Sequence, residues 1–264
     1  MFEVTARLKI HEGELEGFEQ QAAEIMRLTR ELDTKTLRYD WFISGDGTQC
    51  DVREGYLDPD GLLEHNVHVR ETRDQLFRDH AYGHDMTLYG EPSPALAELM
   101  ERMAGHVEFH SFLFWQGLDS DQTIALTARR TEGGTSMFEA TARLRIREGG
   151  LEGFKQQAAE VVRQMREADE QPLRYDWFLS EDGTECEVRE SYVDADALLK
   201  HQQTIAEAKM KLFREFVESH TMTFYSEPSP ALAGALKAMG VTYTAFSFLQ
   251  GLDAGISVLD EVPA

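Results

Sequence analysis

Apolar and polar side chains alternate along the first ten residues of the chain. The stretch FEVTARLKI at residues 2–10 has an apolar side chain at every second position and mostly polar ones between them. Because successive side chains of a β-strand point to opposite faces, this pattern predicts a strand with one apolar and one polar face. Leu15, Phe18, Ala22 and Ile25 then recur at helical spacing, which predicts an amphipathic helix.

A hairpin, two more helices and two more strands are expected next. Residues 38–56, RYDWFISGDGTQCDVREGY, predict two strands joined at the turn-forming pair Asp46-Gly47. Asp58 and Pro59 have the pattern of an N-cap and a first helical residue, and we expect that helix to run to about residue 80. Residues 84–91 predict a strand, residues 93–103 a short helix that begins at Ser93-Pro94, and residues 107–115 a last strand.

The whole pattern occurs twice. A shift of 136 residues aligns MFEVTARLKI with MFEATARLRI and residues 38–56 with RYDWFLSEDGTECEVRESY at 174–192, and more than half of the aligned positions are identical. Solenoid repeats are only about 20 to 50 residues long, so this period indicates a duplicated domain. We expect a first domain at 1–119, a linker at 120–136 and a second domain at 137–264.

A sheet with its helices on one face leaves the other face bare, and two such sheets can cover each other. One chain would then contain its own dimer. The bare faces carry charges of both signs, which we expect to pair across the interface and set its register. These residues are Glu3, Thr5, Arg7, Arg38, Asp40 and Arg53, with Glu139, Thr141, Arg143, Arg174, Asp176 and Arg189 in the second copy.

Two short motifs carry a resemblance to a known family. The strand VRE-x-Y-x-D leads directly into a helix that contains LL-x-H in both copies. With this element order, the chain resembles the antibiotic biosynthesis monooxygenase (ABM) domain of the dimeric α/β-barrel superfamily. The resemblance implies an α+β fold in which two tandem ferredoxin-like domains form an intrachain pseudo-dimeric α/β barrel. Because terminal segments often cross between the halves of such dimers, QTIALTA at 122 and GISVLDEV at 255 are expected to be exchanged arms.

Polar residues interrupt the faces that are predicted to be buried beneath the helices. Glu54 shares a strand face with Cys50, Val52 and Tyr56, and His65 interrupts the apolar stripe of the second helix. The second copy has Glu190 and His201 at the same positions. A carboxylate and an imidazole directed at one buried layer would both have perturbed ionisation, which favours a pocket there.

Aromatic residues on the same face favour a flat aromatic ligand, such as a quinol or a polyketide-like phenol. The candidate substrate-binding residues are Tyr39, Trp41 and Tyr56, with Tyr175, Trp177 and Tyr192 in the second copy. The resemblance implies oxygenation without metal, flavin or other cofactor, so that the partners would be a small aromatic molecule and O₂. The candidate catalytic residues are His65 and His201 as bases, with Glu54 and Glu190 orienting or replacing them.

Other interpretations of these residues stay open. A buried Glu–His or Glu–Tyr hydrogen bond would satisfy the polar groups without any substrate. The chain would then be a non-catalytic small-molecule-binding or stress-responsive barrel, and isomerase or decarboxylase activity is a further alternative. His65 and His68 form an H-x-x-H, but position 204 is threonine in the second copy, so no metal site is expected.

The composition of the chain limits the kinds of partner that it can bind. The formal net charge is −22, and so negative a surface repels nucleic acid and anionic lipid. No run of 18 apolar residues predicts a membrane span. Cys50 and Cys186 make neither a disulfide framework nor a zinc site, so we expect buried thiols in a cytoplasmic setting, with a single bridge between the copies as the alternative. Further homo-oligomerisation is left open.

Overall fold

A computed structural model describes residues 1–118, 137–168 and 172–252. The first repeat has the predicted order of elements. Its bounds are β1 (Phe2–Ile10), α1 (Leu15–Leu32), β2 (Thr36–Ser44), β3 (Gln49–Tyr56), α2 (Pro59–Asp79), β4 (Ala81–Tyr89), α3 (Pro94–Met103) and β5 (Val107–Gly117).

The second repeat has the same order with one helix divided. Its bounds are β6 (Phe138–Ile146), α5 (Leu151–Arg166), β7 (Arg174–Ser180), β8 (Glu185–Tyr192), α6 (Ala195–Thr204), α7 (Ala206–Phe216), β9 (Val217–Phe224), α8 (Pro230–Ala238) and β10 (Tyr243–Gly251). The Thr204 hydroxyl donates to the carbonyl of Lys200, 3.2 Å away, beside the break between α6 and α7. Such a bond to the preceding turn bends helices, and the first repeat has His68 at this position.

The predicted caps and turns are confirmed. The carboxylate of Asp58 accepts a hydrogen bond from the backbone N–H of Gly61, and the hydroxyl of Ser93 accepts one from Leu96. Gly47 and its counterpart Gly183 have φ of 71° and 69°, a conformation that side chains with a Cβ rarely adopt. These local signals explain why the helices and the hairpins begin and end where they do.

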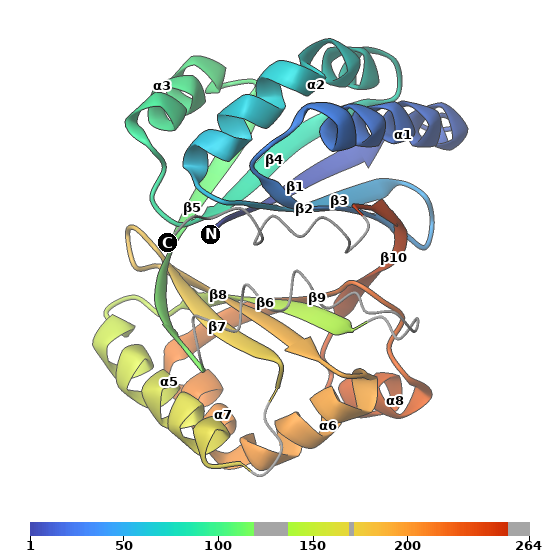
Figure 1. The fold of residues 1–264 in the computed structure, drawn as a ribbon. Helices are drawn as coiled ribbons and strands as arrows, with labels where there is room; N and C mark the ends of the chain where they lie inside the picture. Colours follow the sequence, from blue (N-terminus) through green and yellow to red (C-terminus); the bar gives the residue numbers. More distant parts are fainter. Residues whose placement is uncertain (119–136, 169–171, 253–264) are drawn as a thin grey trace, which may run out of the picture.

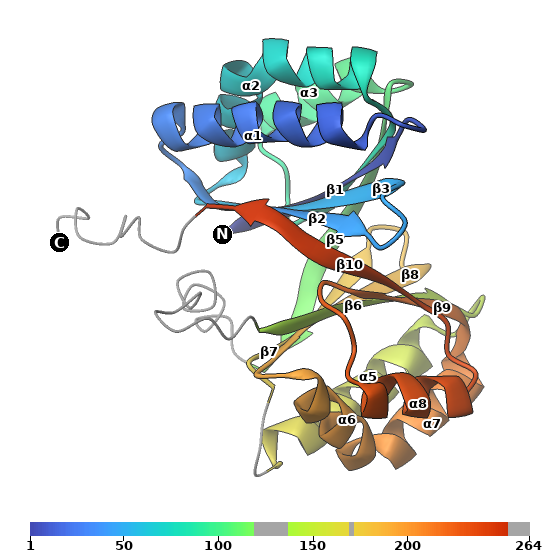
Figure 2. The same ribbon diagram turned by 90° about the vertical axis from the view of Figure 1, so that its right-hand side faces the viewer.

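The ten strands close into one barrel with the order β1-β3-β2-β10-β9-β6-β8-β7-β5-β4. β5 pairs in parallel with β4 of its own repeat and antiparallel with β7 of the other, and β10 does the same with β9 and β2. The helices of the two repeats cover opposite outer sides of the strands (Figures 1 and 2). The fold is therefore the predicted α+β pseudo-dimeric barrel.

The exchange between the halves is made by β5 and β10 themselves. The segments QTIALTA and GISVLDEV, which were expected to cross, lie outside the described residues. Within the described part of the chain, no helix is long and apolar enough to cross a membrane.

Each repeat has its own hydrophobic core between its strands and its helices. The first core contains Tyr39, Trp41 and Tyr56 as predicted, and the second contains their counterparts. Cys50 and Cys186 are buried, free and in different cores, so the alternative of a bridge between them is wrong.

The other strand face points into the barrel, where charges from the two repeats pair. Arg38 donates to both oxygens of Glu139 at 2.9 and 2.7 Å, and Arg53 donates to Glu139 at 2.8 Å. The counterpart Arg174 donates to both oxygens of Glu3 at 2.9 and 2.6 Å. The predicted pairing of charges across the interface is thus present.

Aromatic rings complete this interior. The guanidinium of Arg53 lies 4.4 Å from the ring centroid of Tyr225, and that of Arg189 lies 4.1 Å from the ring centroid of Tyr89. Each ring belongs to the repeat opposite its arginine. Cation–π contacts of desolvated groups are worth about 2 kcal/mol, so these contacts also favour the closed barrel.

We expect Glu139→Gln to lower the free energy of unfolding by about 3 kcal/mol, because it removes the carboxylate partner of the buried Arg53 and leaves Arg38 with Asp40 alone. Although burial alone would raise the pKa of Glu139, the two arginines lower it below its ordinary value. Its stabilising contribution is thus complete above about pH 4.5 and is lost as the pH falls. Urea unfolding at pH 7 measures the change.

Glu160→Gln is the control, because Glu160 forms a surface pair with Arg163 and solvent screens it. No measurable change is expected there. Equal midpoints for the parent and Glu139→Gln would show that the buried pairs do not hold the halves together.

Candidate functional site

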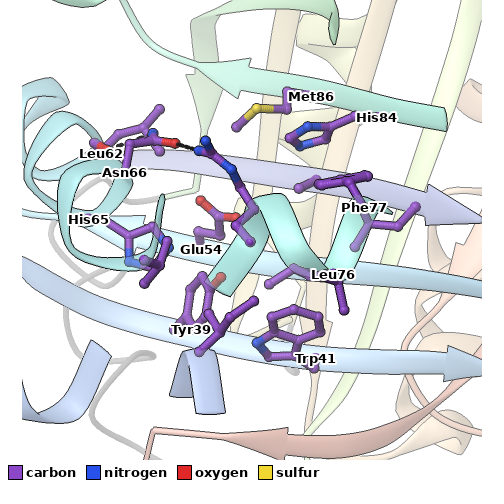
Figure 3. Close-up of a pocket in the computed structure, with 16 residues that line it drawn as sticks. Tyr39, Trp41, Glu54, Leu62, His65, Asn66, Leu76, Phe77, His84 and Met86 are labelled. Carbon is purple, nitrogen blue, oxygen red and sulfur yellow. Dashed lines mark hydrogen bonds between the residues drawn. The ribbon is translucent and has the colours of Figure 1, made fainter. Parts of the chain in front are cut away.

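A small cavity lies under α2 in the first repeat, between this helix and the strands (Figure 3). Tyr39 and Trp41 come from β2 and Glu54 from β3, while His65 and Arg73 come from α2. The strand alternation and the helical stripe that predicted this layer therefore do bring these residues together. The cavity has a volume of about 40 Å³, which is room for one or two water molecules.

His65 is held by a residue that the sequence reasoning missed. Its Nδ1 lies 2.8 Å from Oδ2 of Asp33, while Nδ1 of His68 lies 2.7 Å from Oδ1 of the same carboxylate. Asp33 caps the C-terminus of α1, so the end of one helix supplies the partner of a histidine on the next. The H-x-x-H of α2 thus binds one carboxylate with both rings.

The ionisation of Asp33 fits this role. Burial alone would raise its pKa, but hydrogen bonds with His65, His68 and Thr36 lower it below the ordinary value. An ionised Asp33 fixes Nδ1 of His65 as the protonated nitrogen. Nε2 has no hydrogen-bond partner within the described ranges, and it is the nitrogen that is left to accept a proton.

Aromatic rings surround the imidazole. The ring centroid of Tyr39 lies 4.5 Å from that of His65, and the centroid of Tyr56 lies 6.0 Å away. Trp41 packs edge-on against Tyr39 at 5.7 Å, and its buried indole N–H has no hydrogen-bond partner within the described chain. Tyr39 and Trp41 thus line the cavity, with one free donor, whereas Tyr56 packs near His65 without lining it.

Glu54 has a different partner from the one expected. Its carboxylate accepts a hydrogen bond of 2.7 Å from the hydroxyl of Tyr56, and no hydrogen bond joins it to His65. Burial raises the pKa of Glu54, although the nearby charges of His65 and Arg73 oppose the rise. Orientation of the imidazole thus falls to Asp33, and Glu54 forms the Glu–Tyr bond of the structural alternative.

The rim of the cavity contains polar residues that the sequence reasoning did not assign to it. Arg73 donates to the side-chain oxygen of Asn66, both on α2 and both half-buried. His84 stacks on Phe77 with ring centroids 4.8 Å apart, and burial together with Arg73 lowers its pKa to about 4. His84 thus lines the cavity beside Arg73.

The second repeat has the same groups in a different electrostatic state. His201 is buried beside Tyr175 and Tyr192, but neither ring nitrogen has a hydrogen-bond partner within the described residues. Burial and the charge of Lys209 lower the pKa of His201 to about 3, and burial raises that of Glu190 to about 7. Position 169, the counterpart of Asp33, lies outside the described residues.

The site residues that the sequence reasoning missed could have been found from their recurrence in both copies of the repeat. Asp33 follows the first helix at the same offset as Asp169 in the second copy, and His84 recurs as His220. Arg73 and Asn66 have Lys209 and Gln202 as counterparts, and that lysine likewise donates to that glutamine. The cation and the amide of each rim are thus chemically repeated.

Fold and site define a tandem dimeric α/β-barrel protein with a small buried site under its helices. Residues 137–219 match the family model described as Antibiotic biosynthesis monooxygenase. The resemblance seen in the sequence is therefore confirmed for the second repeat, and the first repeat shares its sequence and element order. A search of curated proteins finds no match to the chain.

Solved structures of two bacterial proteins share the fold. One, named "Putative monooxygenase", from Fusobacterium nucleatum is 9% identical with a TM-score of 0.58, and the match covers 84% of this chain and 89% of that one. Another with that name, from Lactobacillus acidophilus, is 11% identical with a TM-score of 0.53, covering 84% and 90%.

A third similar structure is described as an anthrone oxidase-like protein. It is 7% identical with a TM-score of 0.50, and the match covers 97% of this chain and 94% of that one. Identities this low show a shared fold and nothing about activity.

We expect Glu190→Gln to stabilise the protein at pH 8 but much less at pH 5. The raised pKa of Glu190, about 7, means that its neutral form is favoured in the fold. Its contribution is therefore present below about pH 4.5 and is lost as the pH rises through 7. Between pH 5 and pH 8 the effect of the substitution should change by roughly 2 kcal/mol, measured by urea unfolding.

Glu54→Gln is the matched control in the first repeat. The charges of His65 and Arg73 favour an ionised Glu54, so a smaller change with pH is expected there. An effect of Glu190→Gln that is the same at both pH values would contradict a neutral Glu190.

Proposed function

We propose that the chain is a cofactor-independent monooxygenase that acts on a small aromatic substrate, a quinol or a polyketide-like phenol. One observation carries the proposal: a buried imidazole, fixed by an ionised carboxylate, has a free nitrogen beside aromatic rings. The match of residues 137–219 to the ABM family model supports an oxygenase over other barrel enzymes. The fold shared with an anthrone oxidase-like protein is consistent with a polycyclic phenol.

In this proposal Nε2 of His65 accepts the phenolic proton and Asp33 stabilises the imidazolium that forms. The electron-rich anion reduces O₂, and the two combine at a ring carbon that bears hydrogen, para to the oxygen of a phenol or ortho to the oxygen of a quinol. The hydroperoxide then loses water as its O–O bond breaks, which leaves a quinone. The substrate supplies all four electrons, and one oxygen atom enters the product while the other leaves in water.

The aromatic rings have binding roles. Tyr39 and Trp41 form an apolar floor for a flat ring, and the unpartnered indole N–H of Trp41 donates to a substrate oxygen. Burial raises the pKa of Tyr39 well above its ordinary value, so its hydroxyl stays a neutral donor. Arg73 places a positive charge at the rim, where an anionic intermediate would be stabilised.

Substrate entry requires the rim to open. A cavity of about 40 Å³ is far smaller than the roughly 300 Å³ that drug-sized ligands occupy. The half-buried residues Asn66, Arg73 and His84 line the rim and are polar, so in this proposal they move outward to admit the substrate. The cavity described here is thus the closed state of the site.

The small cavity also favours a second candidate, a non-catalytic barrel that binds a small molecule or none. The Glu54–Tyr56 bond satisfies the buried carboxylate without a ligand. In that case the imidazole pairs with Asp33 only to stabilise the fold.

Oxygen consumption separates the two candidates. Metal-free protein given an anthrone or a naphthoquinol should consume O₂, and His65→Ala should lower kcat/KM at least about 100-fold because the general base is lost. His201→Ala is the matched variant in the second repeat. It should cost far less, since burial and the charge of Lys209 lower the pKa of His201 to about 3, which makes its imidazole a weak base.

Asp33→Asn tests the positioning role. It should lower kcat with little change in KM and shift the acidic limb of the pH profile, whereas a purely structural residue would change stability alone. If no phenol in a panel causes O₂ uptake but the protein still binds ligands, the oxygenase proposal is wrong and the binding-protein candidate remains.

A further inference from the structure

Three side chains able to bind a metal ion meet on the other face of the sheet, away from the cavity under α2. Asp85 comes from β4, and Glu108 and His110 come from β5. The parallel pairing of these strands places Asp85 beside Glu108, and the alternation of β5 puts His110 on the same face. Phe109, between them, packs against the first core, so the cluster faces away from that core.

The distances within the cluster are those of a metal site. Nε2 of His110 lies 3.6 Å from Oδ2 of Asp85 and 3.4 Å from Oε1 of Glu108. Hydrogen bonds between such groups are usually shorter, about 2.7 to 3.2 Å. Ligand atoms about 2.1 Å from a tetrahedral zinc ion lie about 3.4 Å from one another. The imidazole nitrogen thus lies at nearly this separation from both carboxylates, and all three ligand atoms lie within 4.8 Å of one another.

One carboxylate oxygen of the cluster has no hydrogen-bond partner in the described part of the chain. This atom is Oδ1 of Asp85, which is buried. The two arginines nearby are paired elsewhere: Arg143 lies 2.7 Å from Glu185, and Arg7 lies 3.5 Å from Asp51. Both arginines also interact electrostatically with Asp85, but their closest ion pairs are with these other carboxylates.

The second repeat lacks all three ligands. Arg7 faces Asp85 across β1 and β4, and its counterpart Arg143 faces Thr221. In the same way Thr87 pairs with His110, while its counterpart Thr223 pairs with Thr244. The position of Glu108 is held by Thr242. The fold therefore accepts threonine at every one of these positions, and does not need the cluster for its own stability.

Solvent reaches the cluster through an open hollow of about 600 Å³. His110 lines one side of it, and Asp182 and Thr184 from the turn between β7 and β8 line the other. A metal ion with three protein ligands has a free position, which in catalytic zinc sites holds water or a small ligand. The hollow gives that position room.

We propose that Asp85, Glu108 and His110 form a divalent transition-metal site, with Zn²⁺ as the ion that best fits its nitrogen and oxygen donors. The fourth position opens to the hollow between the repeats, where a water molecule binds. The site is asymmetric, because only the first repeat carries it. It does not depend on the oxygenase proposal, since it lies on the opposite face of the sheet from His65.

Calorimetric titration of chelator-treated protein with Zn²⁺ tests the site. The full chain should bind one equivalent, and the triple variant Asp85→Thr/Glu108→Thr/His110→Thr should weaken the Kd at least about 100-fold. Co²⁺ should give the visible absorption of a low-coordinate site in the parent and lose it in the triple variant. His106→Thr is the control, because His106 is exposed and lies close by in sequence but outside the cluster.

The triple variant should fold, because it carries the residues of the second repeat, and an unchanged Tm without metal verifies this. The isosteric variants Asp85→Asn and Glu108→Gln should each weaken binding at least about tenfold. If the triple variant does not fold, these two single variants still test whether the carboxylates bind the metal. Failure of the parent to bind stoichiometric Zn²⁺, or equal affinity in the variants, would overturn the proposal.

Discussion

The reciprocal ion pairs inside the barrel are the interaction on which the rest of this structure depends. Arg38 of the first repeat holds Glu139 of the second, and Arg174 holds Glu3 in return. Each pair is bidentate and mostly buried, so a slip of one strand by one residue would leave charges unpaired inside the barrel. Hydrophobic contacts alone would close the barrel in several registers. The charges select one, together with the exchanged strands β5 and β10.

Because of this constraint, the two faces of each sheet have different roles. The face toward the barrel holds the repeats together with charges and rings. The opposite face, covered by that repeat's own helices, is free to form a site. Because adjacent residues on a strand point to opposite faces, Arg53 belongs to the interface while Glu54 belongs to the buried layer under α2. Likewise His84 faces the cavity and Asp85 the other side, so one short strand contributes to two different sites.

Duplication has also allowed the two halves to diverge. Both keep a buried histidine, a glutamate bonded to a tyrosine and a cation bonded to an amide at the rim. The surroundings of the two histidines differ: Asp33 pairs with His65, and burial together with the charge of Lys209 lowers the pKa of His201 to about 3. A single chain can change one half in this way while the other keeps the original chemistry. A homodimer of identical chains has no such freedom.

The sequence by itself determined the elements, the repeat and the layer in which the candidate residues meet. Alternation along β1 to β3 and the stripe of α2 are local, and they place Tyr39, Trp41 and His65 on a buried face whatever lies beyond. Tertiary structure alone decided the partners. Asp33 reaches His65 only because α1 ends over α2, and Asp85 meets His110 only because β4 and β5 run side by side. Such contacts depend on how elements pack, which residue spacing along the chain does not encode.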